Sequence, residues 1–313
     1  MISRRLLRIK VLQTYYAHRF AHDKSDISAA YKELSLSTQR FHHQYILLID
    51  LLAQIYRLAE QRLEIEQAKF FKSEEAQHPF LCLTNNAILK KIAHSETLEK
   101  FTTQYHISWK EQEDFLRKFF SDILESDFFK QYTNTNESSF ENDKDLCIAI
   151  YDFLSNNDLF YTELEAESIY WNDDYFNSFP LAVKTIRTLG KNKDLRLFPM
   201  YNNEDDRLFG KTLLELTIAE QDERQKLLLP FLKRWDLDRL YSIDLFVMEL
   251  AITEFLHFQT IPLKVSINEY IEISKYYGTK KSWAFINGIL DKIKVKLLEE
   301  NHIKKTGRGL IDS

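Results

Sequence analysis

The sequence predicts an all-α protein, and three observations support this prediction. The 313 residues include only six glycines and five prolines. Sheet-rich folds need many turn residues, so their scarcity favours long helices with short connections. Apolar residues recur at helical spacings of three and four, for example at Phe41, Tyr45, Leu48, Leu52 and Ile55. Finally, 44% hydrophobic and 28% charged residues are the proportions of a soluble globular protein.

Two features of composition bear on where the chain works. Cys82 and Cys147 are the only cysteines and have no paired spacing, which indicates structural thiols in a reducing compartment. Arg8 and Lys10 interrupt the apolar residues of the N-terminus, so it does not resemble a signal peptide. No run of about 18 uncharged apolar residues occurs, so no spanning helix is predicted. We therefore expect a cytoplasmic protein.

Sequence motifs for catalysis are absent. The chain has no Gly-x-Gly-x-x-Gly, no phosphate-binding loop, no Cys-x-x-Cys and no nucleophile elbow. His18 and His22 are four residues apart, but zinc would need a further ligand nearby. We predict no enzyme activity, no cofactor and no metal site.

The charge is unevenly distributed along a chain whose formal net charge is −5. Residues 1–22 contain Arg4, Arg5 and Arg8 but no carboxylate, whereas residues 134–174 are strongly acidic. Such segregation can place a positive surface on an acidic protein. Arg4, Arg5 and Arg8 lie three and four residues apart, so they cluster on one side of a helix. A solvated basic helix end is the simplest interpretation, and contact with phosphates is the alternative.

The first helix is predicted from Ser3, a plausible N-cap, to about His22. The residues expected on its buried face are Ile2, Leu6, Ile9, Tyr16 and Phe20.

The middle of the chain is predicted to be helical throughout. Ser37 is expected to cap a long helix that ends near Phe71, after a shorter helix over 25–34. The polar segment 132–139 is expected to be a connection. The remaining predicted helices cover 85–92, 95–105, 108–126, 143–156, 159–170 and 175–189. The many aromatic residues of this region recur at helical spacing, and we assign them to packing.

Residues 261–293, IPLKVSINEYIEISKYYGTKKSWAFINGILDKI, show two helices and their ends. Pro262 ends the preceding helix, and Ser266 with Glu269 is predicted to form a capping box. Gly278 is expected to close this helix in a left-handed conformation. A second helix is predicted from near Ser282, after a short, basic turn.

This stretch resembles the C-terminal signature of the NusB family of bacterial transcription antitermination factors. The chain shows the family's Ile-Pro turn, its V-x-I-N-E and K-x-[YF]-G marks, and its closing F-[VI]-N-G-[VIL]-L-D-K, in order. The resemblance implies an all-α bundle that binds single-stranded boxA-like RNA. It also implies a partner, the small-subunit ribosomal protein that serves as NusE, within the antitermination complex of RNA polymerase.

Individual site residues follow from the resemblance. Arg4, Arg5, Arg8, Gln13 and Tyr16 match the family's opening R-R-x-x-R-x-x-x-x-Q-x-x-Y. The resemblance implies RNA contacts at the three arginines and a protein-partner contact at Tyr16.

Further site residues lie in the C-terminal part. The resemblance implies a partner contact at Asp244. The residues expected to contact RNA here are Lys264, Lys280, Lys281 and Phe285. The chain departs from the family at Leu245 and Glu249, which replace two arginines.

The predicted organisation is a first NusB-like helix at 1–22, a helical insertion at 23–204, a NusB-like domain at 205–302 and a flexible basic tail at 303–313. The insertion makes this a long form of the family. Two other functions stay open: an assembly adaptor or homodimer without RNA binding, and the RNA-binding part of an RNA-modification system.

Overall fold

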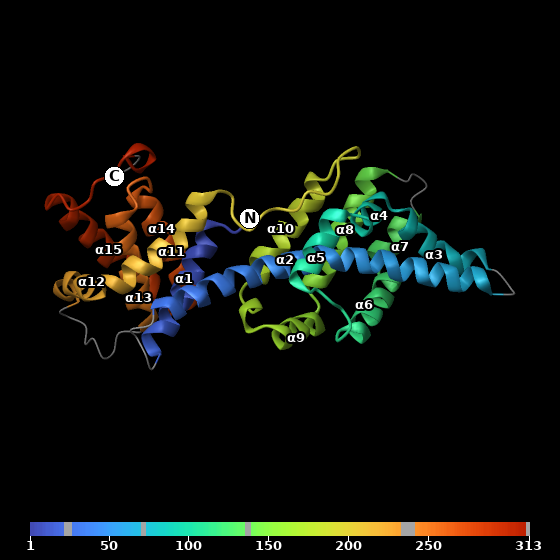
Figure 1. Cartoon of the computed structure of the whole chain (residues 1–313), viewed down its shortest axis with the longest axis horizontal. Helices are drawn as coiled ribbons and strands as arrows, with labels where there is room; N and C mark the ends of the chain where they lie inside the picture. Colours follow the sequence, from blue (N-terminus) through green and yellow to red (C-terminus); the bar gives the residue numbers. More distant parts are fainter. Residues whose placement is uncertain (22–26, 70–72, 135–138, 233–241, 311–313) are drawn as a thin grey trace. The chain divides into compact units, whose positions relative to one another are not determined.

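The computed structural model describes residues 1–21, 27–69, 73–134, 139–232 and 242–310. In these ranges the chain forms fifteen α-helices and three short 3-10 helices, with no β-strand (Figure 1). The prediction of an all-α fold is confirmed. None of the helices in these ranges combines the length and apolar composition needed to cross a lipid bilayer.

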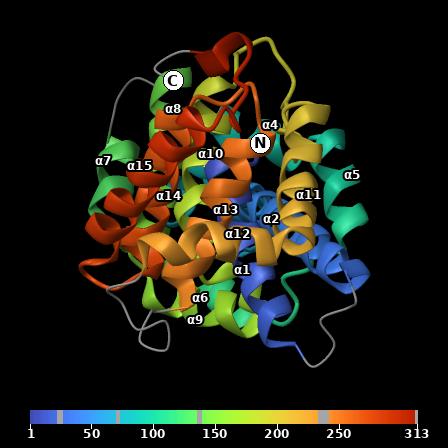
Figure 2. The same cartoon turned by 90° about the vertical axis from the view of Figure 1, so that its left-hand side faces the viewer.

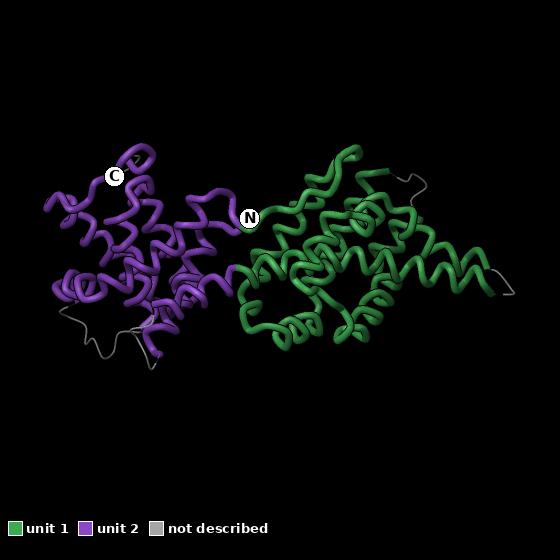
Figure 3. The backbone as a smooth tube through the Cα atoms, in the orientation of Figure 1, with its two compact units in different colours: residues 1, 39–200 green, residues 2–38, 201–313 purple. Residues whose placement is uncertain are grey.

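The chain divides into two compact units (Figure 3). Residues 2–38 and 201–313 form one, here called the terminal unit, and residues 1 and 39–200 form the other, the insertion unit.

The terminal unit is organised around α13 (Ser242–His257), which packs against α1, α11, α12, α14 and α15 (Figure 2). From Phe246 to Phe255 every residue of α13 is buried, which explains why its sequence is apolar on all sides. The surrounding elements are α1 (Arg4–Phe20), α11 (Glu204–Ala219), α12 (Gln221–Leu228), η2 (Leu229–Phe231), α14 (Leu263–Tyr277), α15 (Ser282–Glu299) and η4 (Gly307–Leu310).

The insertion unit is built on the greater part of α2 (Ile27–Ala68). Its core joins α2 to later helices through hydroxyl groups as well as apolar contacts. The Tyr45 hydroxyl lies 2.7 Å from Thr185 Oγ1, and the Tyr151 hydroxyl donates to the Leu48 carbonyl at 2.9 Å. The other elements are α3 (Glu74–Asn85), α4 (Ala87–Ala93), α5 (Glu96–Tyr105), α6 (Glu113–Glu125), α7 (Asp127–Asn134), α8 (Phe140–Ser155), α9 (Asp158–Glu167), η1 (Ile169–Trp171) and α10 (Tyr175–Thr188).

The predicted break before Ser37 is wrong, because α2 runs without interruption from Ile27 to Ala68. The Ser37 hydroxyl donates to the Leu34 carbonyl one turn earlier, so it bonds within the helix and does not cap one. No glycine or proline occurs between residues 27 and 68, so the sequence contains no strong helix-breaking residue there.

Other boundaries also differ from the predictions. Helices α3, α7 and α12 were not predicted, and α6 begins at Glu113, five residues later than expected. Asn86 separates α3 from α4, and its side chain accepts from the amides of Ile88 and Leu89. The predicted connection at 132–139 begins inside α7, which ends at Asn134.

The predicted buried face of α1 is partly wrong. The Ser3 cap is confirmed, since Ser3 Oγ accepts from the Leu6 amide at 3.1 Å. Ile2 and Leu6 are buried as expected, but Tyr16 and Phe20 are 40% and 62% exposed. Apolar residues occupy two overlapping stripes in this helix, and the periodicity alone favours neither. The residues that α1 buries are Leu6, Leu7, Arg8, Lys10, Val11, Leu12, Thr14, Tyr15 and His18; His22 lies outside the described residues.

The predicted start and end of α14 need correction. The helix begins at Leu263, directly after Pro262, so Ser266 and Glu269 lie inside it and form no capping box. Gly278 has φ −92° and ψ −177°, an extended and not a left-handed conformation. A glycine is still required there, because an added Cβ would lie 2.6 Å from both the Ser274 carbonyl oxygen and Ser282 Cβ.

The start of α15 at Ser282 agrees with the prediction, and Ile286, Leu290 and Ile293 are buried. The chain beyond α15 also makes contacts. Lys305 Nζ donates to the Phe258 carbonyl at 2.9 Å, and the Thr306 amide donates to the Gln259 carbonyl at 3.0 Å. Residues of the predicted flexible tail therefore pack on the loop that follows α13.

Candidate nucleic-acid interface

Arg8, one of the predicted RNA-binding residues, is buried. It is 2% exposed, and its guanidinium group forms two hydrogen bonds to Glu254, Nε to Oε2 at 2.8 Å and Nη2 to Oε1 at 2.7 Å. Glu254 also accepts from the Ser266 hydroxyl at 2.6 Å and the Tyr270 hydroxyl at 3.1 Å. The expectation that this arginine projects from the unburied side of the helix is wrong, and it lies where a phosphate has no access.

The Arg8–Glu254 pair joins four helices. Burial opposes the charge on Arg8, but Glu254 outweighs that effect and raises the pKa of the guanidinium above its ordinary value. Arg8 also lies over the rings of Phe209 and Tyr270, at 5.1 and 5.8 Å from their centroids. The pair thus connects α1 to α11, α13 and α14.

Arg4 and Arg5 are more exposed than Arg8 but also have carboxylate partners. Arg5 donates to Glu269 twice, with both bonds at 2.8 Å, and Arg4 Nε donates to Asp206 at 2.7 Å. The hydrogen bonds from Arg5 lower the pKa of Glu269. The two arginine side chains that remain accessible at the start of α1 are therefore partly neutralised.

Side-chain hydrogen bonds connect α1 to α14 at two points, in the same order along both helices. Arg5 contacts Glu269 near their first turns, and Gln13 Nε2 donates to the Tyr277 hydroxyl at 3.3 Å near the end of α14. Eight residues separate the two contacts on each helix. Gln13, part of the opening motif, thus fixes the end of α14 that precedes the basic turn.

Asp244 is buried at 5% exposure, so it is not on an open partner-facing surface as predicted. Its Oδ2 accepts from the Ser282 hydroxyl at 2.7 Å, and the same hydroxyl oxygen accepts from the Thr279 amide at 2.8 Å. Burial raises the pKa of Asp244, although the bond from Ser282 opposes this. Asp244 therefore holds the turn between α14 and α15 against the first turn of α13.

The turn itself, residues 279–281, presents two lysines. Lys280 and Lys281 are exposed, and neither forms an ion pair with any described residue. Exposed aromatic side chains flank them in sequence: Tyr276 is 78% and Trp283 45% exposed, whereas Phe285 is half-buried. The turn is the predicted RNA-binding segment that the structure leaves most accessible.

Lys264, also predicted to contact RNA, is exposed in the first turn of α14. The 15 residues of α14 span about 22 Å at 1.5 Å per residue, so Lys264 lies that far from the basic turn. A strand of RNA would have to follow the length of α14 to reach both.

A second exposed feature is the pair of aromatic side chains Tyr16 and Phe20, which pack over the buried ring of Phe246 and form an aromatic cluster with it. The Tyr16 and Phe20 ring centroids are 4.7 Å apart and lie 5.9 and 6.3 Å from that of Phe246. Phe246 is two residues from Asp244 on α13, so this cluster and the basic turn both border the start of that helix. Tyr16 thus lies on an accessible apolar surface.

Sequence reasoning named Asp244 and Glu249 but did not predict the structural role of the carboxylates that organise this region. Asp244, Glu249 and Glu254 are spaced by five residues on an otherwise apolar helix, and each is buried. Successive members are rotated by about 140° around the helix, so each faces a different neighbour. The available signal was the repeated carboxylate in an apolar helix, because buried charged residues need partners.

Glu249, which replaces a family arginine, accepts from the Tyr15 hydroxyl at 2.8 Å and from Gln225 Nε2 at 3.1 Å. Burial raises the pKa of this carboxyl. The position therefore belongs to the core in this chain, and not to a surface that could meet RNA.

We expect Glu249→Gln to increase the free energy of unfolding at pH 7 by on the order of 1 kcal/mol, because it removes a buried charge. The folded-state pKa lies above the unfolded value, so the wild-type protein loses stability as the pH rises between the two. This increase in the free energy of unfolding should disappear below about pH 4, where Glu249 is protonated in both the folded and the unfolded state. Urea titrations at pH 4 and pH 7 measure both effects, and a variant less stable than wild type at pH 7 would contradict the prediction.

In the described part of the chain, no group of three or more His, Cys, Asp or Glu side chains is placed to hold a metal ion. The region offers cations, exposed aromatic rings and hydrogen-bonding groups, which are the components of a binding surface.

Comparison with known proteins identifies relatives of this chain. The NusB family model matches residues 181–294, from within α10 to within α15. The transcription antitermination protein NusB of Salinibacter ruber is 35% identical over 113 residues, which are 36% of this chain and 71% of that protein. The chain belongs to the NusB family.

Two further NusB proteins match over shorter lengths. That of Thermodesulfovibrio yellowstonii is 43% identical over 91 residues, 29% of this chain and 60% of the relative. That of Chloroherpeton thalassium is 47% identical over 78 residues, 25% of this chain and 37% of the relative. No solved structure gives a significant match. The NusB family match covers α11–α14 and most of α15, whereas α1 lies outside the matched residues but packs on α11 and α13.

Proposed function

We propose that the chain is an RNA-binding transcription antitermination factor. It acts with the small-subunit ribosomal protein that serves as NusE and holds boxA-like RNA from ribosomal RNA operons. Membership of a family whose named members are transcription antitermination proteins supports the general role. The observation that carries the RNA-binding part is the exposed basic turn at Lys280 and Lys281, between the exposed rings of Tyr276 and Trp283.

This arrangement suits unpaired RNA. Lysines neutralise phosphates, and exposed aromatic rings offer faces on which bases stack, at about 1–3 kcal/mol per base. Asp244 and Gln13 act indirectly, by fixing the two sides of the turn. Phe285 is half-buried one turn further on, and its accessible part extends the same surface.

The N-terminal arginines contribute unequally in this proposal. Arg4 and Arg5 can exchange their carboxylate partners for phosphates, whereas Arg8 is the buried support beneath them. We expect Arg4→Ala with Arg5→Ala to lower the salt slope of RNA binding by about 1.4, since each single-strand phosphate contact contributes about 0.7. A fluorescence titration at several salt concentrations measures the slope. An unchanged slope would remove α1 from the RNA site.

The aromatic cluster of Tyr16, Phe20 and Phe246 is the proposed contact for the ribosomal protein. Its Tyr16 and Phe20 rings are accessible and apolar, and the cluster borders the same end of α13 as the basic turn. A pull-down with purified full-length chain and the ribosomal protein, with and without boxA RNA, tests the proposal. We expect the chain to capture the ribosomal protein, and we expect boxA RNA to strengthen this binding.

A second function, an assembly adaptor without RNA binding, is favoured by one observation. Each of the three N-terminal arginines already has a carboxylate partner within the chain, at Asp206, Glu254 or Glu269. In the pull-down, capture of the ribosomal protein that is insensitive to RNA, together with no salt-dependent RNA binding, would favour the adaptor.

A further inference from the structure

The insertion unit contains a cavity of about 270 Å³ that no part of the proposed RNA function uses. It lies among α2, α6, α9, η1 and the loop 106–112, and is partly open to solvent. Its lining includes five aromatic side chains: His43, Trp109, Phe115, Phe160 and Trp171. The volume is just below the range of about 300–1,000 Å³ for ligand pockets, so the cavity suits a small ligand or a single side chain.

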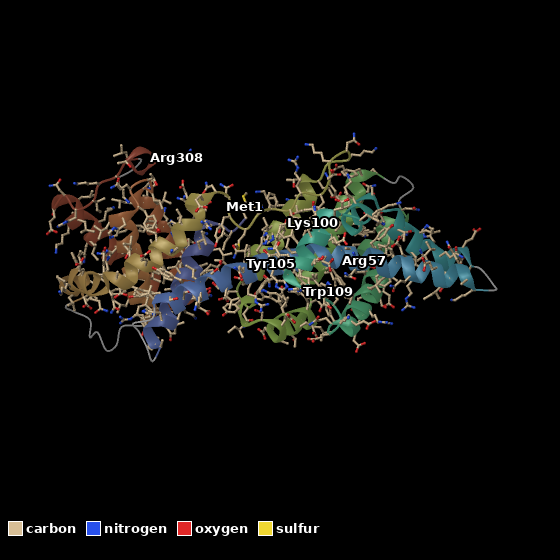
Figure 4. All side chains as sticks on the ribbon, in the orientation of Figure 1. Met1, Arg57, Lys100, Tyr105, Trp109 and Arg308 are labelled. Atoms are coloured by element: carbon tan, nitrogen blue, oxygen red, sulfur yellow. The ribbon has the colours of Figure 1, made fainter. Side chains whose placement is uncertain are left out.

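Hydrogen bonds hold the two indole rings in place. Trp109 Nε1 donates to Asp50 Oδ2 at 3.0 Å, and Trp171 Nε1 donates to the Arg40 carbonyl at 2.8 Å. Both N–H groups are therefore occupied within the protein. Trp171 is 1% exposed and Trp109 is 9% exposed, so the accessible π-surface is that of Trp109. Tyr105, the last residue of α5, and Trp109, in the loop before α6, are labelled in Figure 4.

His43 is positioned just as firmly. Its ring stacks on Tyr105 with the centroids 5.5 Å apart and an interplanar angle of 9°, and it meets Trp171 edge-on at 5.3 Å. Burial, with the nearby charge of Arg40, lowers the pKa of His43 to about 4. The imidazole is therefore neutral at physiological pH and adds no positive charge to the cavity.

The polar part of the cavity is acidic. Glu111, Glu163 and Glu167 contribute carboxylates to the lining, against the single ammonium group of Lys110. Glu163 is half-buried, and Gln112 Nε2 lies 3.5 Å from Glu167 Oε2, at the limit of a hydrogen bond. Aromatic faces beside carboxylates attract positive charge, through the ring quadrupoles and through direct Coulomb attraction.

We propose that this cavity binds an organic cation, an ammonium or guanidinium group carried on an apolar body. The ring of Trp109 contacts the apolar part, and Glu163 and Glu167 neutralise the charge. Two sources share this chemistry, a free amine and the lysine or arginine side chain of a peptide. The inference is independent of RNA binding, since every residue it uses lies in the insertion unit.

Calorimetric titration of the full-length chain with matched pairs of probes tests the proposal. Benzylamine is compared with its neutral counterpart benzyl alcohol, and a blocked Gly-Arg-Gly peptide with its citrulline counterpart. Each favoured cation is expected to bind at least about tenfold more tightly than its neutral partner. If benzylamine binds more tightly than the arginine peptide, the ligand is a free amine. If the arginine peptide binds more tightly, the ligand is a peptide side chain.

Glu163→Gln combined with Glu167→Gln is expected to abolish this preference for the cation. Asp158→Asn combined with Glu165→Gln is the matched control, because it removes two exposed charges from the same helix α9 outside the cavity lining. Circular dichroism confirms that both variants fold. The proposal is overturned if neither cation binds below ~10 mM, if the neutral probes bind equally well, or if the control variant loses the preference too.

Discussion

Arg8→Ala is expected to lower the free energy of unfolding by about 3–5 kcal/mol, the usual cost of removing one partner from a buried ion pair. The substitution leaves the Glu254 carboxylate, which is fully buried, without its cation and with only the Ser266 and Tyr270 hydroxyls as donors. It also opens a space beside Phe209, which Arg8 covers. Urea unfolding monitored by circular dichroism measures the change.

Two comparisons separate the buried pair from a general effect of charge. Arg5→Ala removes an arginine whose side chain is half-exposed, and we expect it to cost no more than about 1 kcal/mol. Arg8→Met combined with Glu254→Met should recover most of the loss, since a buried ion pair can be replaced by apolar side chains of similar size. Equal losses for Arg8→Ala and Arg5→Ala would show that Arg8 is not the support described here.

Lys280→Glu combined with Lys281→Glu is expected to reduce RNA affinity by more than about tenfold at low salt. The change replaces attraction by repulsion at two phosphates, on the most accessible cations of the proposed surface. Because the lysines are exposed and form no ion pairs with described residues, folding should be unaffected. Binding to the ribosomal protein should persist, since that contact is assigned to the aromatic cluster at Tyr16.

Lys292→Glu combined with Lys304→Glu makes the same change in net charge at two other exposed lysines of the terminal unit. If this control weakens RNA binding equally, the effect is one of total charge, and the turn has no special role. If the variant at 280 and 281 binds RNA as tightly as the wild-type chain while Arg4→Ala with Arg5→Ala does not, only α1 remains in the site.

The fold class could be predicted because it depends on the whole composition. Few glycines and prolines leave little material for turns, and that constraint does not depend on any one residue. Local signals were less reliable. Ser37 and the pair Ser266–Glu269 have the residue types of helix caps, but they lie inside helices, where their side chains bond to the backbone or to other helices. A capping pattern shows that a side chain is able to cap a helix, but it does not show which group the side chain bonds to in the folded protein.

The site was harder to predict for a similar reason. Within residues 1–22 the arginines have no acidic neighbour, so the segment looks like a free basic patch. Their partners lie 202, 246 and 264 residues away, at Asp206, Glu254 and Glu269. The turn at Lys280 and Lys281 was predicted as exposed because it follows a helix end in the same local stretch, and it is exposed in the structure.

The pairing of Arg8 with Glu254 also has a consequence for biosynthesis. The ribosome makes α1 first, but Glu254 follows 246 residues later, which at about 5–20 residues per second is a delay of roughly 12–50 s. Throughout that time the side of α1 that carries Val11, Leu12 and Tyr15 has no α13 to cover it. The nascent chain must therefore wait with an apolar helix uncovered while the whole insertion is translated. Chaperones that bind emerging apolar segments would meet this helix before its own partner does.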